Sequence, residues 1–350
     1  MMIRVIAVAG LLFVAIGAQA QEGTVGPGGG AQSAASDGAT YESAKELAAR
    51  GRLEQAMAQL DALATESPEP VGVERLRGMI FYQRAQFLQA VTAFAKAAER
   101  DPNDHESLEM QGVSLFRMGR TREALPLLEK ARTGVQGANV DPNYVLALCY
   151  ADMQRYDDAR RAFASQYGFE PDSAEAHLLT GRLFLRRELR DQAGAEAMKA
   201  LEMNPSMPLA HELLGEVALA RGDAAGAIKE FEAERKINPL NPDLYDRLGD
   251  AYLRGGQYAE AQQALNRAVL LEPTSTGPYI LLGETFLKMK QPIQALQYLD
   301  RAVKMDPANY ITHNLLGQAY KATGQLAEAN REFKTVVELQ HRNDPKPAEK

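Results

Sequence analysis

Residues 242–275 read PDLYDRLGDAYLRGGQYAEAQQALNRAVLLEPTS and contain two stretches with helical periodicity. The first stretch places its larger apolar residues and one glycine on a single helix face, at positions i, i+3, i+4 and i+7: Tyr245, Leu248, Gly249 and Tyr252. Gly255-Gly256 interrupts this pattern. A second apolar stripe follows: Tyr258, Ala261, Ala264, Leu265 and Ala268. It ends at Glu272-Pro273, because the residue before a proline avoids the α-helical region. The segment therefore predicts two helices joined by a turn.

This pattern recurs along the chain with a period of 34 residues, apart from one step of 35. An alanine in the second stripe marks each copy: Ala56, Ala90, Ala124, Ala159, Ala193, Ala227, Ala261, Ala295 and Ala329. A glycine stands 12 residues before most of these alanines, and a proline stands 12 residues after most of them. The copies are residues 37–70, 71–104, 105–138, 140–173, 174–207, 208–241, 242–275, 276–309 and 310–343. One copy cannot bury both of its apolar stripes, so the copies must stack on one another.

These residues resemble the tetratricopeptide repeat family over residues 37–343. The resemblance lies in the aromatic-x-x-Leu-Gly-x-x-Tyr of the first helix, the Gly-x-Tyr-x-x-Ala turn and the closing proline. It implies an all-α fold, a right-handed superhelical solenoid of about nine helix–turn–helix repeats. It also implies that the first helices line a concave groove that binds a peptide or helix segment of another protein.

The third repeat departs from the pattern because it lacks the closing proline and is followed by one inserted residue. Two glycines over residues 133–140 suggest a joint between the third and fourth repeats. The alternative is a slightly longer but rigid turn. Pro126 lies one turn inside the second helix of the third repeat and is expected to bend it.

The first twenty residues have the three parts of a cleaved signal peptide. Arg4 supplies the positive charge, residues 5–18 are apolar or glycine, and Ala18-Gln19-Ala20 is a small-x-small cleavage site. The rival interpretation is a membrane anchor, but a helix that spans a membrane needs about 20 apolar residues, and residues 5–18 are too few. We therefore expect an exported protein, in the bacterial periplasm or secreted, with no membrane span in the mature chain. Residues 21–36 predict a flexible glycine- and serine-containing linker, and residues 344–350 a disordered tail.

Composition argues against several other classes. The chain has 350 residues, is 45% hydrophobic and carries a net charge of −7, which argues against a nucleic-acid binder. Its single cysteine, Cys149, excludes an intramolecular disulfide and a cysteine-based zinc site, and is expected to be a small buried apolar residue. The chain contains no phosphate-binding loop, no His-Glu-x-x-His and no Gly-x-Ser-x-Gly, so neither an enzyme nor a cofactor-binding protein is expected.

Three of the five histidines share one position of the repeat: His177, His211 and His313. Two of them lie in adjacent repeats, so a metal-binding pair is conceivable. The preferred interpretation is that each ring fills an aromatic slot in the packing, because no acidic residue or third histidine was identified in that register. No metal site is therefore predicted.

The resemblance implies that the second, fifth, ninth, twelfth and thirteenth positions of each repeat point into the groove. These positions also share one helix face by spacing alone. The first half of the groove is then apolar with arginines among its residues: Arg75, Met79, Tyr82, Val113, Phe116, Arg117, Tyr144, Leu148, Arg182 and Arg186. The second half gains a row of carboxylates: Glu212, Glu216, Asp243, Asp246, Asp250 and Glu284. The alternative is that the apolar members pack against neighbouring repeats.

Two functions follow from this pattern. The first is an exported scaffold whose groove binds a peptide or helix of a cell-envelope protein. The second is a structural protein of the envelope that associates with itself and has no distinct client. The second function is suggested by the ninth repeat, because no clear helix follows its second helix and the exposed side could dock on another copy.

Overall fold

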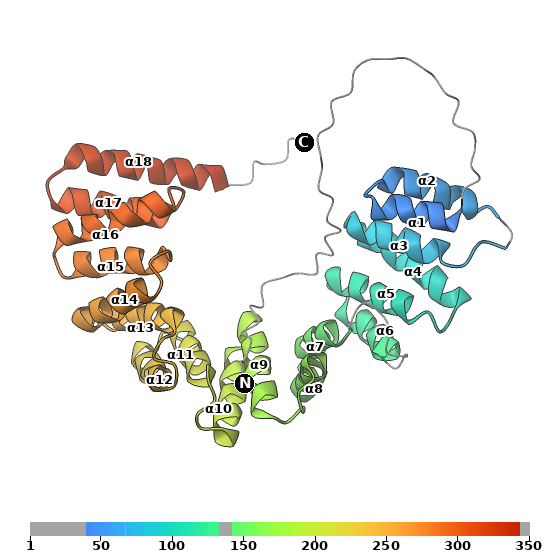
Figure 1. Cartoon of the computed structure of the whole chain (residues 1–350), viewed down its shortest axis with the longest axis horizontal. Helices are drawn as coiled ribbons and strands as arrows, with labels where there is room; N and C mark the ends of the chain where they lie inside the picture. The colour runs from blue at the N-terminus through green and yellow to red at the C-terminus, as the bar shows by residue number, and fades with distance from the viewer. Residues whose placement is uncertain (1–39, 67, 133–141, 344–350) are drawn as a thin grey trace, which may run out of the picture. The chain divides into compact units, whose positions relative to one another are not determined.

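The computed structural model describes residues 40–66, 68–132 and 142–343, and within these ranges every regular element is a helix. The expected signal peptide, linker, joint at 133–140 and tail lie outside the described residues. Contacts group the chain into two compact units, an N-terminal unit (Met1–Met153) and a C-terminal unit (Gln154–Lys350). The division falls after α7, the first helix of the fourth repeat. Each unit is described by itself below (Figure 1).

The N-terminal unit holds the first seven described helices, which alternate between the first and second helix of a repeat (Figure 1). They are α1 (Tyr41–Ala49), α2 (Leu53–Leu63), α3 (Val73–Gln83), α4 (Phe87–Arg100), α5 (His105–Arg117), α6 (Thr121–Arg132) and α7 (Asn143–Asp152). Helix α6 continues through Pro126, which is exposed, as far as Arg132. The proline thus removes one backbone donor without ending the helix.

The C-terminal unit opens with a second helix and continues with five complete pairs among its described residues. They are α8 (Tyr156–Tyr167), α9 (Ala174–Arg186), α10 (Arg190–Met203), α11 (Ala210–Ala220), α12 (Ala224–Ile237), α13 (Pro242–Arg254), α14 (Tyr258–Leu271), α15 (Gly277–Lys288), α16 (Pro292–Met305), α17 (Tyr310–Ala322) and α18 (Leu326–Asn343). The prediction of an all-α repeat solenoid is confirmed.

Residues 242–275 show how the sequence produces one pair. Helix α13 ends at Arg254, and the chain then turns through Gly256, whose φ of 73° lies in the left-handed region that glycine adopts without strain. Helix α14 begins at Tyr258 and ends at Leu271, two residues before Pro273. Most residues of the predicted apolar stripes of both helices are buried, with Leu248 at 1% and Leu265 at 0% exposure, whereas Tyr252 and Tyr258 are half-buried. Local signals and tertiary packing therefore agree in this segment.

The glycine of the first helix marks the place where the two helices of a pair touch. A Cβ atom placed on Gly249 would lie 2.4 Å from Leu265 Cγ on α14. Gly283 stands in the same relation to Leu299, and Gly317 to Phe333. Because real Cβ atoms do not approach so closely, the position requires a residue without a side chain.

Consecutive pairs share their apolar cores. In the C-terminal unit, one buried cluster draws on three repeats: Leu265, Leu282, Phe286, Ala295, Leu299, Leu315, Leu316 and Ala319. In the N-terminal unit, Leu60 and Leu63 of α2 pack in one cluster with Val73 and Ile80 of α3. Each pair therefore depends on its neighbours for burial, as expected of stacked repeats.

Candidate functional site

The residues at the second, fifth, ninth, twelfth and thirteenth positions of the repeats are called the first-helix face from here on. In the N-terminal unit this face is half-buried and mixed in character. Met79, Tyr82, Val113 and Phe116 are half-buried, Leu148 is buried and Tyr144 is 38% exposed. Apolar groups therefore reach the surface here, although Met79 and Tyr82 also pack against a buried cluster.

Arginines accompany these apolar residues. Arg75 on α3 forms ion pairs with Asp104 at 3.3 Å and with Glu106 at 3.6 Å, at the start of α5. The exposed Arg117 at the end of α5 lies over the ring of Phe87, 5.5 Å from its centroid, and that ring makes an edge contact with Tyr82. Arg75 is thus engaged between repeats, whereas Arg117 covers an aromatic pair with its charge still in solvent.

In the C-terminal unit, two of the expected groove carboxylates are held by arginines of neighbouring repeats. Glu212 on α11 is only 4% exposed and lies 3.5 Å from Arg182 on α9 and 3.6 Å from Arg247 on α13. Arg247 also pairs with Glu216 at 2.9 Å, and the Asn241 side-chain amide donates to Glu212. Burial raises the pKa of the Glu212 carboxyl despite these arginines. Glu212 therefore links three successive repeats, and Glu216 links two.

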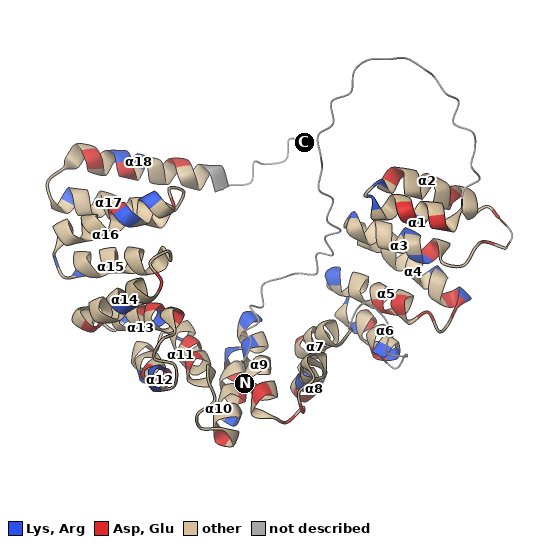
Figure 2. Cartoon of the chain, in the orientation of Figure 1, with Lys and Arg blue, Asp and Glu red and all other residues tan. Residues whose placement is uncertain are grey.

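The other carboxylates of the predicted row lie on α13 and α15. Asp243 is exposed, Asp250 pairs with Arg254 at 2.9 Å, and Glu284 is half-buried. Figure 2 shows acidic and basic residues interspersed on these helices. Two cations beside this row already have partners: Arg254 pairs with Asp250, and Arg247 pairs with Glu212 and Glu216.

Asp246 is the least satisfied member of this row. It is half-buried, and among the described residues none donates a hydrogen bond to its Oδ1 atom, which is shielded from solvent. Burial raises the pKa of this carboxyl to about 6, with Asp250 and Asp243 adding to the effect and Arg247 opposing it. A cationic group supplied from outside would favour its ionised form and give Oδ1 a donor.

Arg186 ends α9 and is exposed, whereas Arg182 lies one turn earlier and is directed to Glu212. The spacing of the repeat predicted that both would lie on the first-helix face, but spacing does not show which charges pair across repeats. The sequence analysis missed Arg247 and Asn241. Neither occupies a position of the first-helix face, and both act on it through Glu212.

The three histidines of the shared register each face a glutamate, which the sequence analysis missed. In each case the histidine Nδ1 lies close to a glutamate Oε2 on the second helix of the same repeat, 19 residues later. The distances are 2.5 Å for His177–Glu196, 2.8 Å for His211–Glu230 and 2.6 Å for His313–Glu332. The statement that no acidic residue shares the register is therefore wrong, because the partner lies on the other helix. No cluster of three or more potential metal ligands occurs in the described residues.

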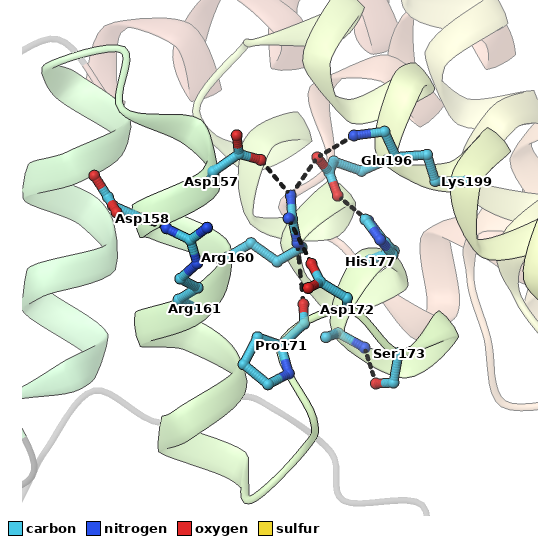
Figure 3. A network of polar contacts seen from close by, with 11 residues as sticks. Asp157, Asp158, Arg160, Arg161, Pro171, Asp172, Ser173, His177, Glu196 and Lys199 are labelled. Carbon is cyan, nitrogen blue, oxygen red and sulfur yellow. Dashed lines mark hydrogen bonds and ion pairs between the residues drawn. The ribbon is translucent and has the colours of Figure 1, made fainter.

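Around His177 the pair is part of a larger polar network, in which His177, Glu196 and Arg160 are buried and Asp157 and Asp172 are exposed (Figure 3). Arg160 on α8 donates to the carbonyl oxygen of Pro171 at 3.0 Å and pairs with Asp157 and Asp172, each at 2.8 Å. Its guanidinium also lies 3.5 Å from Glu196 on α10. Arg160 thereby joins three segments: α8, the loop that precedes α9, and α10.

Cys149 on α7 is fully buried.

No helix in the described part of the chain is both long and apolar enough to cross a membrane.

Family models of the tetratricopeptide repeat match residues 144–200 and 190–242, and again residues 218–280 and 286–347. Together these matches cover more than half of the chain. A model of the anaphase-promoting complex, cyclosome, subunit 3 matches residues 83–166. A comparison with curated protein sequences finds no match.

Solved structures of other repeat proteins are similar to parts of the chain. A fragment of MamA from Desulfovibrio magneticus RS-1 has a TM-score of 0.47 and 24% identity, over 50% of this chain and 98% of its own. YrrB, described as a TPR protein with an unusual peptide-binding site, has a TM-score of 0.46 and 21% identity, over 53% and 95%. A chain of the APC/C hetero-tetramer Cut9–Hcn1 has a TM-score of 0.44 and 19% identity, over 79% and 54%.

Proposed function

The chain belongs to the tetratricopeptide repeat family, and we propose that it is an exported scaffold for protein–protein interaction. Its partner is a peptide or helix segment of a cell-envelope protein, bound on the first-helix face. The mixture of apolar and charged side chains on this face supports the proposal, because aromatic and apolar residues with arginines among them are common in interfaces. The absence of any recognised catalytic motif in the sequence supports a binding role over a catalytic one.

Asp246 carries this proposal. A carboxyl that is half-buried, lies between Asp243 and Asp250 and lacks a donor to Oδ1 is unfavourable in the free protein. A lysine or arginine of a bound segment would remove that penalty. Half-buried apolar residues on the same face, Ile280 and Leu287 on α15, would contact apolar residues of the segment. The C-terminal unit therefore favours a segment that is both basic and apolar.

The first twenty residues support export to the envelope, because their charged, apolar and small-residue parts stand in the order of a signal peptide. The single cysteine is consistent with an oxidising compartment, where unpaired thiols are a liability. An enzyme function has no support in the described residues beyond the presence of histidines, and three of these, His177, His211 and His313, each contact a glutamate.

The binding proposal is tested with a fluorescent amphipathic peptide that carries leucines on one face and lysines and arginines on the other. We expect the full chain to bind it more tightly than a charge-reversed peptide with the same leucines. The variant Asp243→Asn/Asp246→Asn/Asp250→Asn should bind at least about tenfold more weakly, because it removes the charges that attract and pair the basic groups. Fluorescence anisotropy measures both affinities.

The matched control removes the same number of charges from exposed residues away from the first-helix face: Glu202→Gln/Glu260→Gln/Glu272→Gln. This variant should bind like the unmodified chain. Binding should also be several-fold weaker at about pH 5 than at about pH 7.5, because Asp246 becomes ionised as the pH rises through about 6. Equal affinity for both peptides, or equal loss in both variants, would contradict the proposal.

The second candidate, a self-associating structural protein, has one observation in its favour. The outer side of α18 exposes Leu326 and Val337, the latter to 51%, and within the described residues no further helix follows. In the preceding repeat the residue equivalent to Val337 is Val303, which packs against a buried cluster. A second copy could cover the equivalent surface of α18.

A further inference from the structure

The turns inside the repeats of the C-terminal unit are rich in cations, although the chain as a whole carries a net charge of −7. In each of the five complete repeats we consider the last two residues of the first helix, the turn, and the first two residues of the second helix. These segments are called the turn edge from here on: residues 185–191, 219–225, 253–259, 287–293 and 321–327. The turn edge holds eight cationic residues: Arg186, Arg187, Arg190, Arg221, Arg254, Lys288, Lys290 and Lys321. It holds three acidic residues: Glu188, Asp191 and Asp223.

The five turns lie on the same side of the stacked repeats. The first helices of successive repeats contact one another from α9 through α11, α13 and α15 to α17, and each repeat turns from its first helix to its second at the same end (Figure 1). An ion pair of 2.5 Å between Arg221, in the turn of the sixth repeat, and Asp191, near the start of α10, shows that adjacent turns meet. The cations of separate repeats therefore form one charged edge.

These cations are available to a ligand. All eight are exposed. Arg221 and Arg254 pair with aspartates, and both pairs are open to solvent. Within the described part of the chain, four others have no ion-pair partner: Arg190, Lys288, Lys290 and Lys321. Each of these side chains can thus contact an external anion without first breaking an ion pair.

The opposite edge of the same unit has the opposite charge. It consists of the loops between second and first helices, at residues 168–173, 204–209, 238–241, 272–276 and 306–309. These loops contain four acidic residues and neither arginine nor lysine: Glu170, Asp172, Glu272 and Asp306. An anionic surface would therefore attract the turn edge and repel the opposite edge, which gives the unit a defined orientation.

The helix dipole explains only part of the charge on the turn edge. Arg254, Lys288 and Lys321 lie in the last turns of first helices, where the dipole favours a cation. Arg190 is instead the first residue of α10, where the dipole disfavours a cation. Lys290 lies in a turn between two helices. The accumulation of cations exceeds what the helices need for their own stability, which favours a role in binding.

Two aliphatic side chains protrude among these cations. Ile293 at the start of α16 is 66% exposed, and Leu326 at the start of α18 is 61% exposed. Cations mixed with exposed aliphatic groups suit the surface of an anionic bilayer, which neutralises the former and takes up the latter at the level of its headgroups. An acidic peptide would neutralise the cations but gives the two aliphatic side chains no apolar layer. Leu270 is also exposed, but it lies two residues from Glu272 of the opposite edge.

We propose that the turn edge of the C-terminal unit docks on a lipid bilayer that contains anionic headgroups. The attraction is the sum of many weak contacts, because each lysine or arginine near an anionic surface contributes separately. Ile293 and Leu326 add a smaller apolar contribution at the headgroup level. The second, fifth and ninth positions of the first-helix face lie away from the turn edge, so they stay accessible to a partner in the docked protein. The inference does not depend on the function proposed above.

The test is cosedimentation of the full chain with vesicles of phosphatidylcholine, either alone or mixed with about 40% phosphatidylglycerol. We expect the mixed vesicles to bind at least about tenfold more tightly at low salt. This difference should shrink at about 0.5 M salt, because salt screens the attraction. All proteins compared carry the same first twenty residues, so any binding through the apolar residues 5–18 is equal among them and is measured with the uncharged vesicles.

The variant Arg190→Gln/Arg221→Gln/Lys290→Gln removes cations from three repeats of the turn edge. None of these residues occupies a position of the first-helix face. We expect this variant to bind anionic vesicles at least about tenfold more weakly and to bind the amphipathic peptide as before. Circular dichroism verifies that its helices are intact, which is expected because all three side chains are exposed.

The matched control is Arg235→Gln/Arg301→Gln/Lys304→Gln. It makes the same substitutions at exposed residues in the second halves of α12 and α16, away from the turn edge, and it also breaks one solvent-exposed ion pair, Arg235–Glu232. This control should bind anionic vesicles like the unmodified chain. Equal binding of uncharged and anionic vesicles, or equal losses in the two variants, would overturn the proposal.

A further variant, Ile293→Ser/Leu326→Ser, separates a bilayer from an acidic protein segment as the ligand. It should bind anionic vesicles more weakly but leave any binding of soluble polyglutamate unchanged, because only the bilayer takes up aliphatic groups. Tight binding of polyglutamate together with unchanged vesicle binding by this variant would identify an acidic segment as the ligand and overturn docking on lipid. Loss of peptide binding with vesicle binding intact would contradict only the function proposed above.

Discussion

At the level of single residues, seven of the nine repeats have a glycine at the place where an added side chain would collide with a neighbouring helix. The sequence already marks this position, because glycine recurs there in seven of the nine repeats. The structure adds the reason: at six of these seven glycines an added Cβ would lie within 2.4–2.7 Å of a side chain on the second helix of the same repeat. Leu299 opposite Gly283 is completely buried, so it has little space into which to move.

Gly283→Ala should therefore destabilise the C-terminal unit. The added Cβ would lie 2.4 Å from both Leu299 Cγ and Leu299 Cδ2, so the two helices or the leucine must shift. We expect the free energy of unfolding to fall by about 1–3 kcal/mol, the usual range for overpacking a core. Urea unfolding followed by circular dichroism measures the change.

Gly194→Ala is the matched control, because Gly194 also lies inside a helix, α10, and is also buried. The nearest atom to its added Cβ, Val217 Cγ1, is 3.7 Å away, which is an ordinary van der Waals distance. Alanine should then stabilise the protein by up to about 1 kcal/mol through its higher helix propensity. Similar destabilisation by both substitutions would show that the close contact at Gly283 is not the cause.

Charge pairing at this scale was harder to predict than packing. The repeat period located Glu212, Glu216 and Arg182 on the first-helix face. It did not reveal that Arg247, outside that face, lies between repeats and pairs with both glutamates. Long flexible side chains pair with the charges that lie closest in the folded protein, and the repeat period of the sequence does not specify these distances. The histidine partners were detectable in principle, because the separation of 19 residues is constant.

Among the elements, helix positions followed from local signals in the sequence. Gly255-Gly256 and Pro273 bound α13 and α14 as predicted, because glycine permits the turn and the residue before proline leaves the helical region. Pro126 was expected to bend α6, and the structure shows that it does not end this helix. Helix α6 continues through it, since one lost backbone bond at an exposed position is compensated by Leu125 and Leu128 packed in the core.

The two proposed functions make different predictions for helix α18: its exposed side stays free in a scaffold and is covered by a second copy in a self-associating protein. Leu326 and Val337 are exposed on one side of it, but Asn330 and Gln340 are exposed along the same helix. A stable dimer buries about 800 Å² on each partner, which so interrupted a strip does not readily provide. We therefore expect light scattering at micromolar concentrations to give the mass of a single chain.

Self-association through α18 would give a different light-scattering result. If a second copy covers α18, the scattering mass should rise with concentration, and Val337→Lys should return it to that of one chain. A mass that rises in both proteins would place the self-contact elsewhere in the molecule. A constant single-chain mass leaves the scaffold as the better-supported function.

For the whole molecule, the period of the sequence determines the architecture. Length alone would suggest two ordinary globular domains, whereas the repeats show that length here counts stacked helix pairs. The same reasoning could not locate the division of contacts after Met153, because the sequence pattern is continuous across α7 and α8. Which residues bind a partner is also beyond the pattern, since the repeat specifies a scaffold and leaves surface residues variable.

Export is a property of the complete chain and is tested on it. We expect protein recovered from the envelope fraction of its source cells to begin at Gln21, because cleavage follows Ala18-Gln19-Ala20. Mass spectrometry of the intact protein identifies the first residue. Recovery of the uncleaved chain from the cytoplasm would contradict export. The variant Ala20→Arg, which disrupts the small-x-small site, should accumulate uncleaved.

The alternation of histidine and tyrosine at one register has a consequence for protein engineering. The ring and its partner belong to one repeat, but the ring also contacts the carbonyl oxygen of the proline that closes the preceding repeat, so an exchange must keep that contact. Tyr245→His with Ala264→Glu would introduce into the seventh repeat what the ninth already contains. The chain thus shows that one register of a helical array accepts either a tyrosine or a histidine–glutamate pair.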